Sequence, residues 1–152
     1  GSIKFFFEKD IESGLYHLQK ASELCPSDIY IISRHVLFLI YNGEIEKALV
    51  ELKRAIRLDP FSYDLLYAEQ GICYYWLKDF SKAIESFRKV KLNKNNLFYL
   101  SACHFEKGDL KKGGELLNEA EATTGLNCDN FIKSQPFTKS EMKDTLRASF
   151  KK

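Results

Sequence analysis

The stretch YAEQGICYYWLKDFSKAIESFRKVKLNKN, residues 67–95, sets an aromatic residue, a glycine and small or apolar residues at intervals that recur along the chain. Its second half contains Ala83, Phe87, Val90 and Asn95. The same spacing returns as Gly14, Leu18, Ala21 and Pro26; as Ala48, Leu52, Ala55 and Pro60; and as Gly113, Leu117, Ala120 and Gly125. The first three copies start 34 and 35 residues apart, and the last starts 30 residues on. A repeat of this period is typical of stacked helix pairs, whose function lies in a surface and not in a catalytic pocket.

The recurrence extends upstream of each small residue. Tyr67, Gln70, Gly71 and Tyr74 stand ahead of Ala83. The corresponding positions of two other copies hold Ile32, His35, Val36 and Leu39, and then Leu97, Leu100, Ser101 and His104. This pattern resembles the tetratricopeptide repeat, which has an aromatic residue, a Leu-Gly pair and a tyrosine, followed by Ala, Phe and Pro at fixed offsets. The copy around Gly71 matches best, while the others keep the spacing but replace several signature residues.

The resemblance implies an all-α fold, a right-handed superhelix of antiparallel helix pairs. The repeats would span about residues 3–28, 29–62, 63–93 and 94–125, and the first copy is truncated. The spacing agrees, because each copy has two apolar stripes of helical period separated by a short polar turn. The predicted turns are Asn42-Gly43, Lys78-Asp79 and Lys107-Gly108-Asp109. Small residues let the two helices of a pair approach closely, at Gly14, Ala48, Ala83 and Gly113.

The C-terminal tail is predicted to be a loop, residues 126–137, followed by a capping helix, residues 138–152. Gly125 can end the preceding helix in a left-handed conformation. Thr138 and Glu141 have the spacing of a capping box, and Met142, Leu146 and Phe150 share one face of the helix. This helix either covers the last repeat, whose open end would expose core, or folds back into the groove of the solenoid, or docks a partner.

Composition and motifs indicate no enzyme, metal site or cofactor. The four cysteines lack zinc-ligand spacing, and Cys73 and Cys103 occupy equivalent positions where a small apolar side chain packs. His35 and His104 fall on the packed face, without a catalytic partner at a suitable spacing. The chain has no apolar run long enough to cross a membrane, and reduced thiols favour a cytoplasmic location. Residues 78–112 hold nine basic and four acidic residues, which we interpret as a solvated helix face, so no nucleic-acid partner is expected.

The family resemblance places the function in the concave groove, which the first helix of each repeat lines. The candidate partner-binding residues are Tyr30, Arg34, Leu37, Tyr41, Glu69, Ile72, Tyr75, Trp76, Phe98, Tyr99 and Phe105. Tryptophan and tyrosine are enriched at binding hot spots, which favours an apolar or amphipathic protein segment as the ligand. The alternative is that these aromatic side chains pack between helices or under the tail. Arg34 alone cannot form the multi-residue clamp that family members use for acidic chaperone tails.

The partner is therefore predicted to be a protein or peptide that the chain binds as a non-enzymatic scaffold. A homodimer through Phe5, Phe6 and Phe7 or through the C-terminal helix is an alternative. A weaker resemblance suggests a second alternative function. Pro136-Phe137 and residues 146–152 are similar to the ends of repeat domains attached to bacterial nucleotide cyclases and of those that follow winged-helix activators. That resemblance implies a regulatory or oligomerisation module of a larger signalling protein.

Overall fold

The computed structural model describes residues 12–14, 16–21, 23–25, 27–61, 64–92 and 94–152. Within them the regular secondary structure is helical throughout, and residues 12–14, 16–21 and 23–24 are helical as well. The later helices are α2 (Ile29–Tyr41), α3 (Ile45–Leu58), α4 (Asp64–Trp76), α5 (Phe80–Arg88), α6 (Lys94–Glu106), α7 (Leu110–Thr124), α8 (Cys128–Ser134) and α9 (Ser140–Ser149). The predicted aromatic run Phe5–Phe7 lies outside the described residues.

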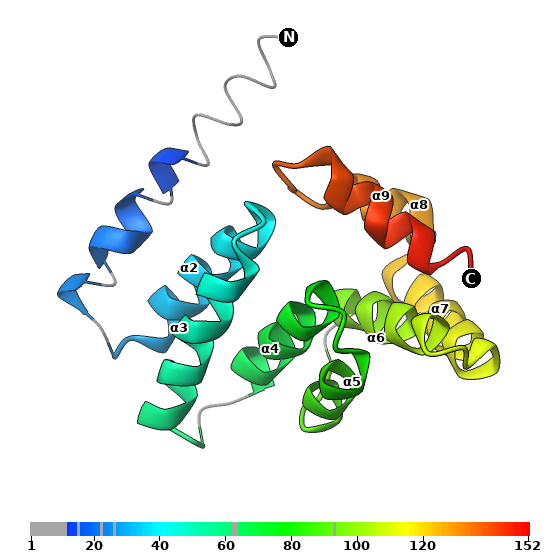
Figure 1. Cartoon of the computed structure of the whole chain (residues 1–152), viewed down its shortest axis with the longest axis horizontal. Helices are drawn as coiled ribbons and strands as arrows, with labels where there is room; N and C mark the ends of the chain where they lie inside the picture. The colour runs from blue at the N-terminus through cyan, green and yellow to red at the C-terminus, as the bar shows by residue number, and fades with distance from the viewer. Residues whose placement is uncertain (1–11, 15, 22, 26, 62–63, 93) are drawn as a thin grey trace, which may run out of the picture.

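Successive helices pack as pairs, α2 with α3, α4 with α5 and α6 with α7, and each pair stacks on the next (Figure 1). Helix α4 also contacts α2 and α6, so the first helices of the three pairs lie side by side. The core follows the repeat, since the small residues Ala48 and Ala83 are fully buried. The predicted all-α solenoid of helix pairs is confirmed.

Close packing within the pairs explains the small residues of the repeat. A Cβ atom added to Gly71 would lie 2.8 Å from the ring of Phe87, and one added to Gly113 would lie 3.0 Å from the ring of Phe105. Both rings belong to the other helix of the same pair, so a side chain at either glycine would push the two helices apart. Gly14 differs, because a Cβ atom there would lie 3.3 Å from the ring of Phe38, which belongs to the first helix of the following pair.

The turn inside each pair repeats one backbone conformation. Gly43, Lys78 and Gly108 have φ angles of +79°, +62° and +82°, and they occupy equivalent positions in the three pairs. Lysine pays a steric cost in this left-handed region that glycine does not. The side chains of Asp79 and Asp109 then cap the second helix, by accepting hydrogen bonds from the backbone N–H three residues on.

The C-terminal tail corrects the prediction for residues 126–137. The chain ends α7 at Gly125, whose φ of +73° is left-handed as predicted, but it then forms α8 in place of a loop. Asn127 caps this helix by accepting a hydrogen bond from the Asn130 N–H at 2.8 Å, and the helix buries Phe131 and Ile132 completely. The burial of these two side chains stabilises a helix that is too short to be predicted from periodicity.

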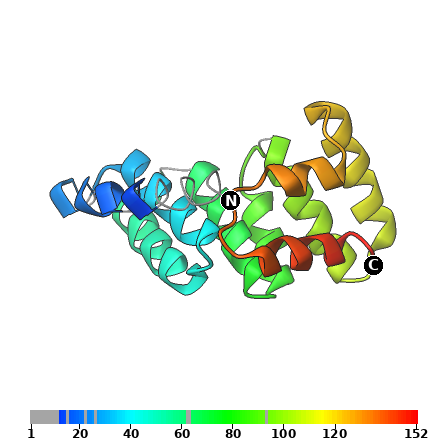
Figure 2. The same ribbon diagram turned by 90° about the horizontal axis from the view of Figure 1, so that it is seen from above.

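The predicted capping box at Thr138 and Glu141 is also wrong. Helix α9 begins at Ser140, and its N-cap residue Lys139 makes no side-chain cap hydrogen bond. Thr138 instead bonds to the end of α2: its N–H donates to the Tyr41 carbonyl at 3.0 Å, and its hydroxyl donates to Asn42 Oδ1 at 3.0 Å. We call residues 128–152 the C-terminal strap. In Figure 2 the strap lies alongside the helix pairs of the C-terminal half, with its turn directed toward α2, and it does not extend beyond the last helix pair.

Candidate functional site

The predicted groove residues come together on α2, α4 and α6, but most of them are covered. Two are exposed: Tyr30, at 79%, and Arg34. Leu37, Tyr41, Trp76 and Phe105 are half-buried. The others are buried, namely Glu69, Ile72, Tyr75, Phe98 and Tyr99. The strap accounts for much of this burial. Of the positions considered above for the C-terminal helix, the structure therefore shows the one on the surface of the first helices.

An aromatic cluster forms the middle of this surface. Tyr75, Trp76 and Tyr99 make edge-to-face ring contacts, with centroids 5.0 Å apart for Tyr75–Trp76 and 5.5 Å apart for Tyr75–Tyr99. We call the surface formed by Tyr41, Tyr75, Trp76, Phe98, Tyr99 and Phe105 the aromatic face. Edge-to-face pairs of this kind add to the stabilisation that area burial gives.

The strap contacts the aromatic face through phenylalanines. In α8, Phe131 stacks on Phe98 with ring centroids 4.1 Å apart and an interplanar angle of 9°. Phe137 lies against rings from two helices, with centroids 5.6 Å from Tyr41 and 5.3 Å from Trp76. These contacts reach from α6 back to α2, so the strap crosses all three first helices. Phe131 lies outside the repeat pattern, so the repeat spacing predicts no contact for it.

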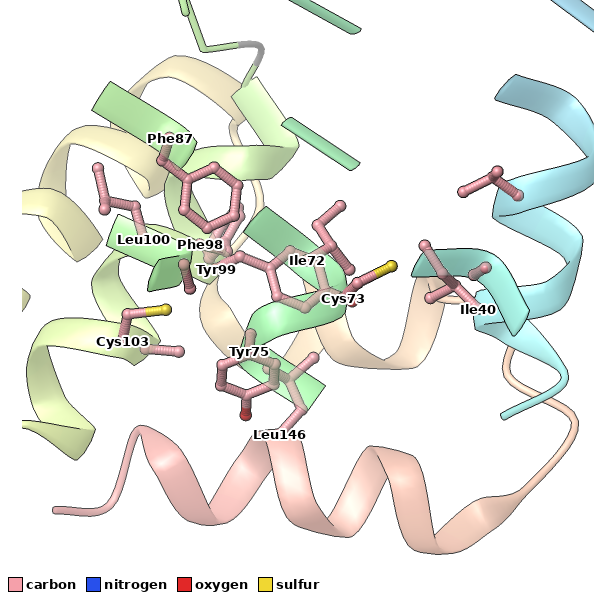
Figure 3. Packing of buried hydrophobic residues seen from close by; sticks show 14 of the residues in the cluster. Ile40, Ile72, Cys73, Tyr75, Phe87, Phe98, Tyr99, Leu100, Cys103 and Leu146 are labelled. Atoms are coloured by element: carbon pink, nitrogen blue, oxygen red, sulfur yellow. The ribbon is translucent and has the colours of Figure 1, made fainter. Parts of the chain in front are cut away.

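Helix α9 lies against the aromatic face with the side that the sequence predicts to be apolar. Leu146 is fully buried and Met142 nearly so, and Leu146 points from α9 toward Tyr75 (Figure 3). Phe150 follows, with its ring centroid 6.2 Å from that of Phe105. The i, i+4 spacing of these three apolar residues matches the face that one side of a helix presents.

A polar network holds the end of α9. Ser149 is buried and donates its hydroxyl proton to Glu106 Oε1 at 2.7 Å, so the Tyr75 hydroxyl, 2.6 Å from Ser149 Oγ, is the donor in that contact. Lys152 Nζ pairs with the second oxygen of Glu106 at 2.7 Å. Burial alone would raise the pKa of Glu106, but the hydrogen bonds from Lys152 and Ser149 outweigh burial and lower it. We call Tyr75, Glu106, Ser149 and Lys152 the polar latch.

Glu69 has a different environment from Glu106, although both belong to first helices. Its carboxyl is buried between α2 and α4, where Oε1 accepts a hydrogen bond from the Ser33 hydroxyl at 2.5 Å. The other oxygen, Oε2, is buried and has no hydrogen-bond partner among the described residues. Burial raises the pKa of Glu69 to about 8, and the Ser33 hydrogen bond offsets only part of that rise. Glu69 is therefore a packed carboxyl and not an exposed contact residue.

Three other titratable side chains of the first helices are buried. Cys73 and Cys103 are fully buried, as their spacing predicts, and burial raises the pKa of each thiol to about 12. His104 is buried too, and burial lowers its pKa although Asp109 lies 3.7 Å away. No group of three metal-binding side chains occurs among the described residues. In the same part of the chain, no helix has the length and hydropathy of a membrane span.

Comparison with known proteins gives one informative similarity. The chain is 30% identical over 116 residues to the human tetratricopeptide repeat protein 13, an alignment that covers 74% of this chain and 13% of the human protein. The chain thus spans a small part of that relative's length. No family model and no solved structure matches. The similarity supports helical repeats of tetratricopeptide type, and it points to a non-enzymatic repeat protein.

Proposed function

We propose that this chain is a protein-interaction module, in which the accessible surface of α2 and α4 binds a segment of another protein. The similarity to a tetratricopeptide repeat protein supports this class of function. The observation that carries the proposal is the exposure of Tyr30, of which 79% is accessible although its helix packs into the solenoid. Tyrosine combines a large apolar ring with a polar tip, which suits it to partner contacts.

The proposed contact surface is the part of the first helices that the strap leaves accessible. We call Tyr30, Arg34, Leu37 and Leu65 the open end. Tyr30 and Leu65 hold equivalent positions one repeat apart, and Leu65 is 39% exposed. Arg34 adds a positive charge next to these apolar groups, while Glu69 is withdrawn into the core. The open end therefore suits an apolar segment that carries an acidic side chain.

The chemistry of the open end does not suit a partner that binds through an acidic chain terminus. A clamp for an acidic terminus needs several cationic or amide groups that converge on one carboxylate. Arg34 is one such group, and its neighbours in the open end are apolar. We therefore propose a partner that binds by apolar burial, with Arg34 selecting among partners more than supplying affinity.

Site-specific photocrosslinking tests the proposal. A photoreactive phenylalanine analogue replaces Tyr30 in one version of the chain and Val50, 68% exposed on α3, in a matched control. We expect one partner to crosslink from position 30 and not from position 50. Leu65→Ser should then weaken that capture at least about tenfold while the far-ultraviolet circular dichroism stays unchanged. Equal crosslinking from both positions, or capture that Leu65→Ser leaves unaltered, would contradict the proposal.

A further inference from the structure

The C-terminal strap lies on the aromatic face as a bound peptide would. It is one continuous segment, joined to α7 only through residues 125–127, and its phenylalanine side chains lie on rings from α2, α4 and α6. Most of its contacts are made by side chains. The Thr138 N–H, bonded to the Tyr41 carbonyl, supplies a backbone hydrogen bond between the strap and the first helices. A helix that is held mainly by its side chains can be exchanged for another helix with similar side chains.

The strap leaves part of its binding surface unfilled. A cavity of about 320 Å³ lies between α9 and the ends of α4, α5 and α6. On the strap side it is lined by Thr145, Ala148, Ser149 and Lys152, and on the other side by residues that include Trp76 and Phe80. Thr145 and Ala148 are small, so apolar surface of the aromatic face stays uncovered beside the polar latch. A helix with a larger side chain at the position of Ala148 would bury that surface and bind more tightly.

We propose that the strap is an intramolecular competitor, and that the aromatic face binds in its place an amphipathic helix of a partner protein. This helix carries apolar residues at i, i+4 and i+8, as Met142, Leu146 and Phe150 do in the strap. It has a large apolar residue where the strap has Ala148, and a basic residue after its last turn to pair with Glu106. The inference rests on the proposed function, because it extends the partner surface from the open end to the aromatic face.

Competition within one chain sets the conditions for exchange. A tethered segment acts at an effective concentration of about millimolar, so it excludes external helices of equal affinity at lower concentrations. The apparent Kd of a partner helix is its intrinsic Kd divided by the fraction of chains with the strap released. A change that weakens the strap must therefore lower the apparent Kd without any change in the aromatic face itself.

Binding of a synthetic strap peptide to the full chain tests this relation. The probes are a fluorescent peptide of residues 128–152 and the same peptide with Ala148→Leu. The chains are the unaltered protein, Leu146→Ala in the strap, and the matched control Leu110→Ala, which changes a leucine that is 54% exposed on α7. We expect Leu146→Ala to bind the first peptide at least about tenfold more tightly than the other two chains do. We expect the Ala148→Leu peptide to bind about threefold more tightly than the first.

Three results would overturn the inference. Equal affinity of the three chains would show that the strap does not compete. An Ala148→Leu peptide that binds no more tightly would remove the proposed specificity. A dimer of Leu146→Ala in light scattering would make a second copy of the chain the occupant, in place of a partner helix.

Hydrogen exchange on the unaltered chain tests the same inference without a variant that has to fold. We expect the amides of α9 to exchange through an opening that leaves α4 and α6 protected. Exchange of α9 only together with α4 and α6 would make the strap an inseparable part of the core and overturn the inference. Neither experiment involves the open end. A failure here, combined with specific crosslinking from position 30, would leave the proposed function standing.

Discussion

Replacing Glu69 by glutamine should stabilise the chain, and the gain should grow with pH. The carboxyl is 2% exposed, and only one of its oxygens is hydrogen-bonded among the described residues. Glutamine keeps the oxygen that accepts from Ser33 and replaces the other with a neutral NH₂ group. It therefore resembles the protonated acid, which is the form that this buried environment favours.

The size of the effect follows from the pKa of Glu69. Folding raises it from 4.5 to about 8, so ionisation in the folded chain is disfavoured. At about 1.4 kcal/mol per pH unit, this difference corresponds to roughly 5 kcal/mol above pH 8 and roughly 3 kcal/mol at pH 7. Below pH 4.5 both the folded and the unfolded chain hold the proton, and the cost disappears. The unaltered chain thus loses stability relative to Glu69→Gln as pH rises from 4.5 to 8.

Denaturant unfolding followed by circular dichroism measures this difference. We would compare the free energies of unfolding of the two chains at pH 5, 7 and 8.5, with Glu115→Gln, an exposed change on α7, as the control. Other titrating groups affect both chains alike and cancel in the difference. A gain for Glu69→Gln that is the same at pH 5 and pH 8.5 would refute the reasoning, because it would show that ionisation at this position costs nothing.

Three further changes test other features by the same measurement. Lys78→Gly should stabilise the chain by about 1 kcal/mol, because glycine adopts the left-handed turn without strain; a loss would contradict this. Gly71→Ala should destabilise it by about 1 to 3 kcal/mol, because the new Cβ would lie 2.8 Å from the Phe87 ring; a neutral result would show that the pair separates easily. Glu106→Gln should cost about 1 kcal/mol at pH 7, because it removes the ion pair with Lys152. Folding lowers the pKa of Glu106, so this loss of stability should fade as the pH falls below 4.5. A loss that persists there would argue against the ion pair.

The repeat spacing predicts the helix pairs well because it reflects a strong steric requirement. Gly113 and Ala83 recur where a helix meets its partner within a pair, and a larger residue at Gly113 would collide with the ring of Phe105. The turns at Gly43 and Gly108 are predicted for a similar reason, since the left-handed backbone there favours glycine. Constraints of this kind act over a few residues, so they can be read from the sequence.

The C-terminal strap is harder to predict because distant contacts determine its structure. Helix α8 has only seven residues, and it is stabilised by Phe131 on Phe98 more than by its own periodicity. The Asn127 cap was the available signal for it. Thr138 has the spacing of a helix cap, but it bonds to the end of α2, 97 residues away in the sequence. Nothing in the local sequence distinguishes these two roles.

The candidate site illustrates the same limit. Family resemblance selects the residues that face inward, and the structure does bring Tyr75, Trp76 and Tyr99 together. The family resemblance cannot show which of these residues a later segment of the chain covers. Partner binding by these residues therefore stays a prediction. It now depends on displacement of the strap, except at Tyr30 and its neighbours in the open end.

The bond between Thr138 and Tyr41 has a consequence for how the chain folds. In an open array of repeats each unit meets only its neighbours, so folding can begin anywhere and the ends unravel independently. Here the last segment closes onto the first complete pair, which raises the mean sequence separation of contacting residues. We expect slower folding than an open array of this length, since a long loop must close before these contacts form. In return, unfolding should be a single cooperative transition instead of a progressive loss of repeats from the C-terminal end.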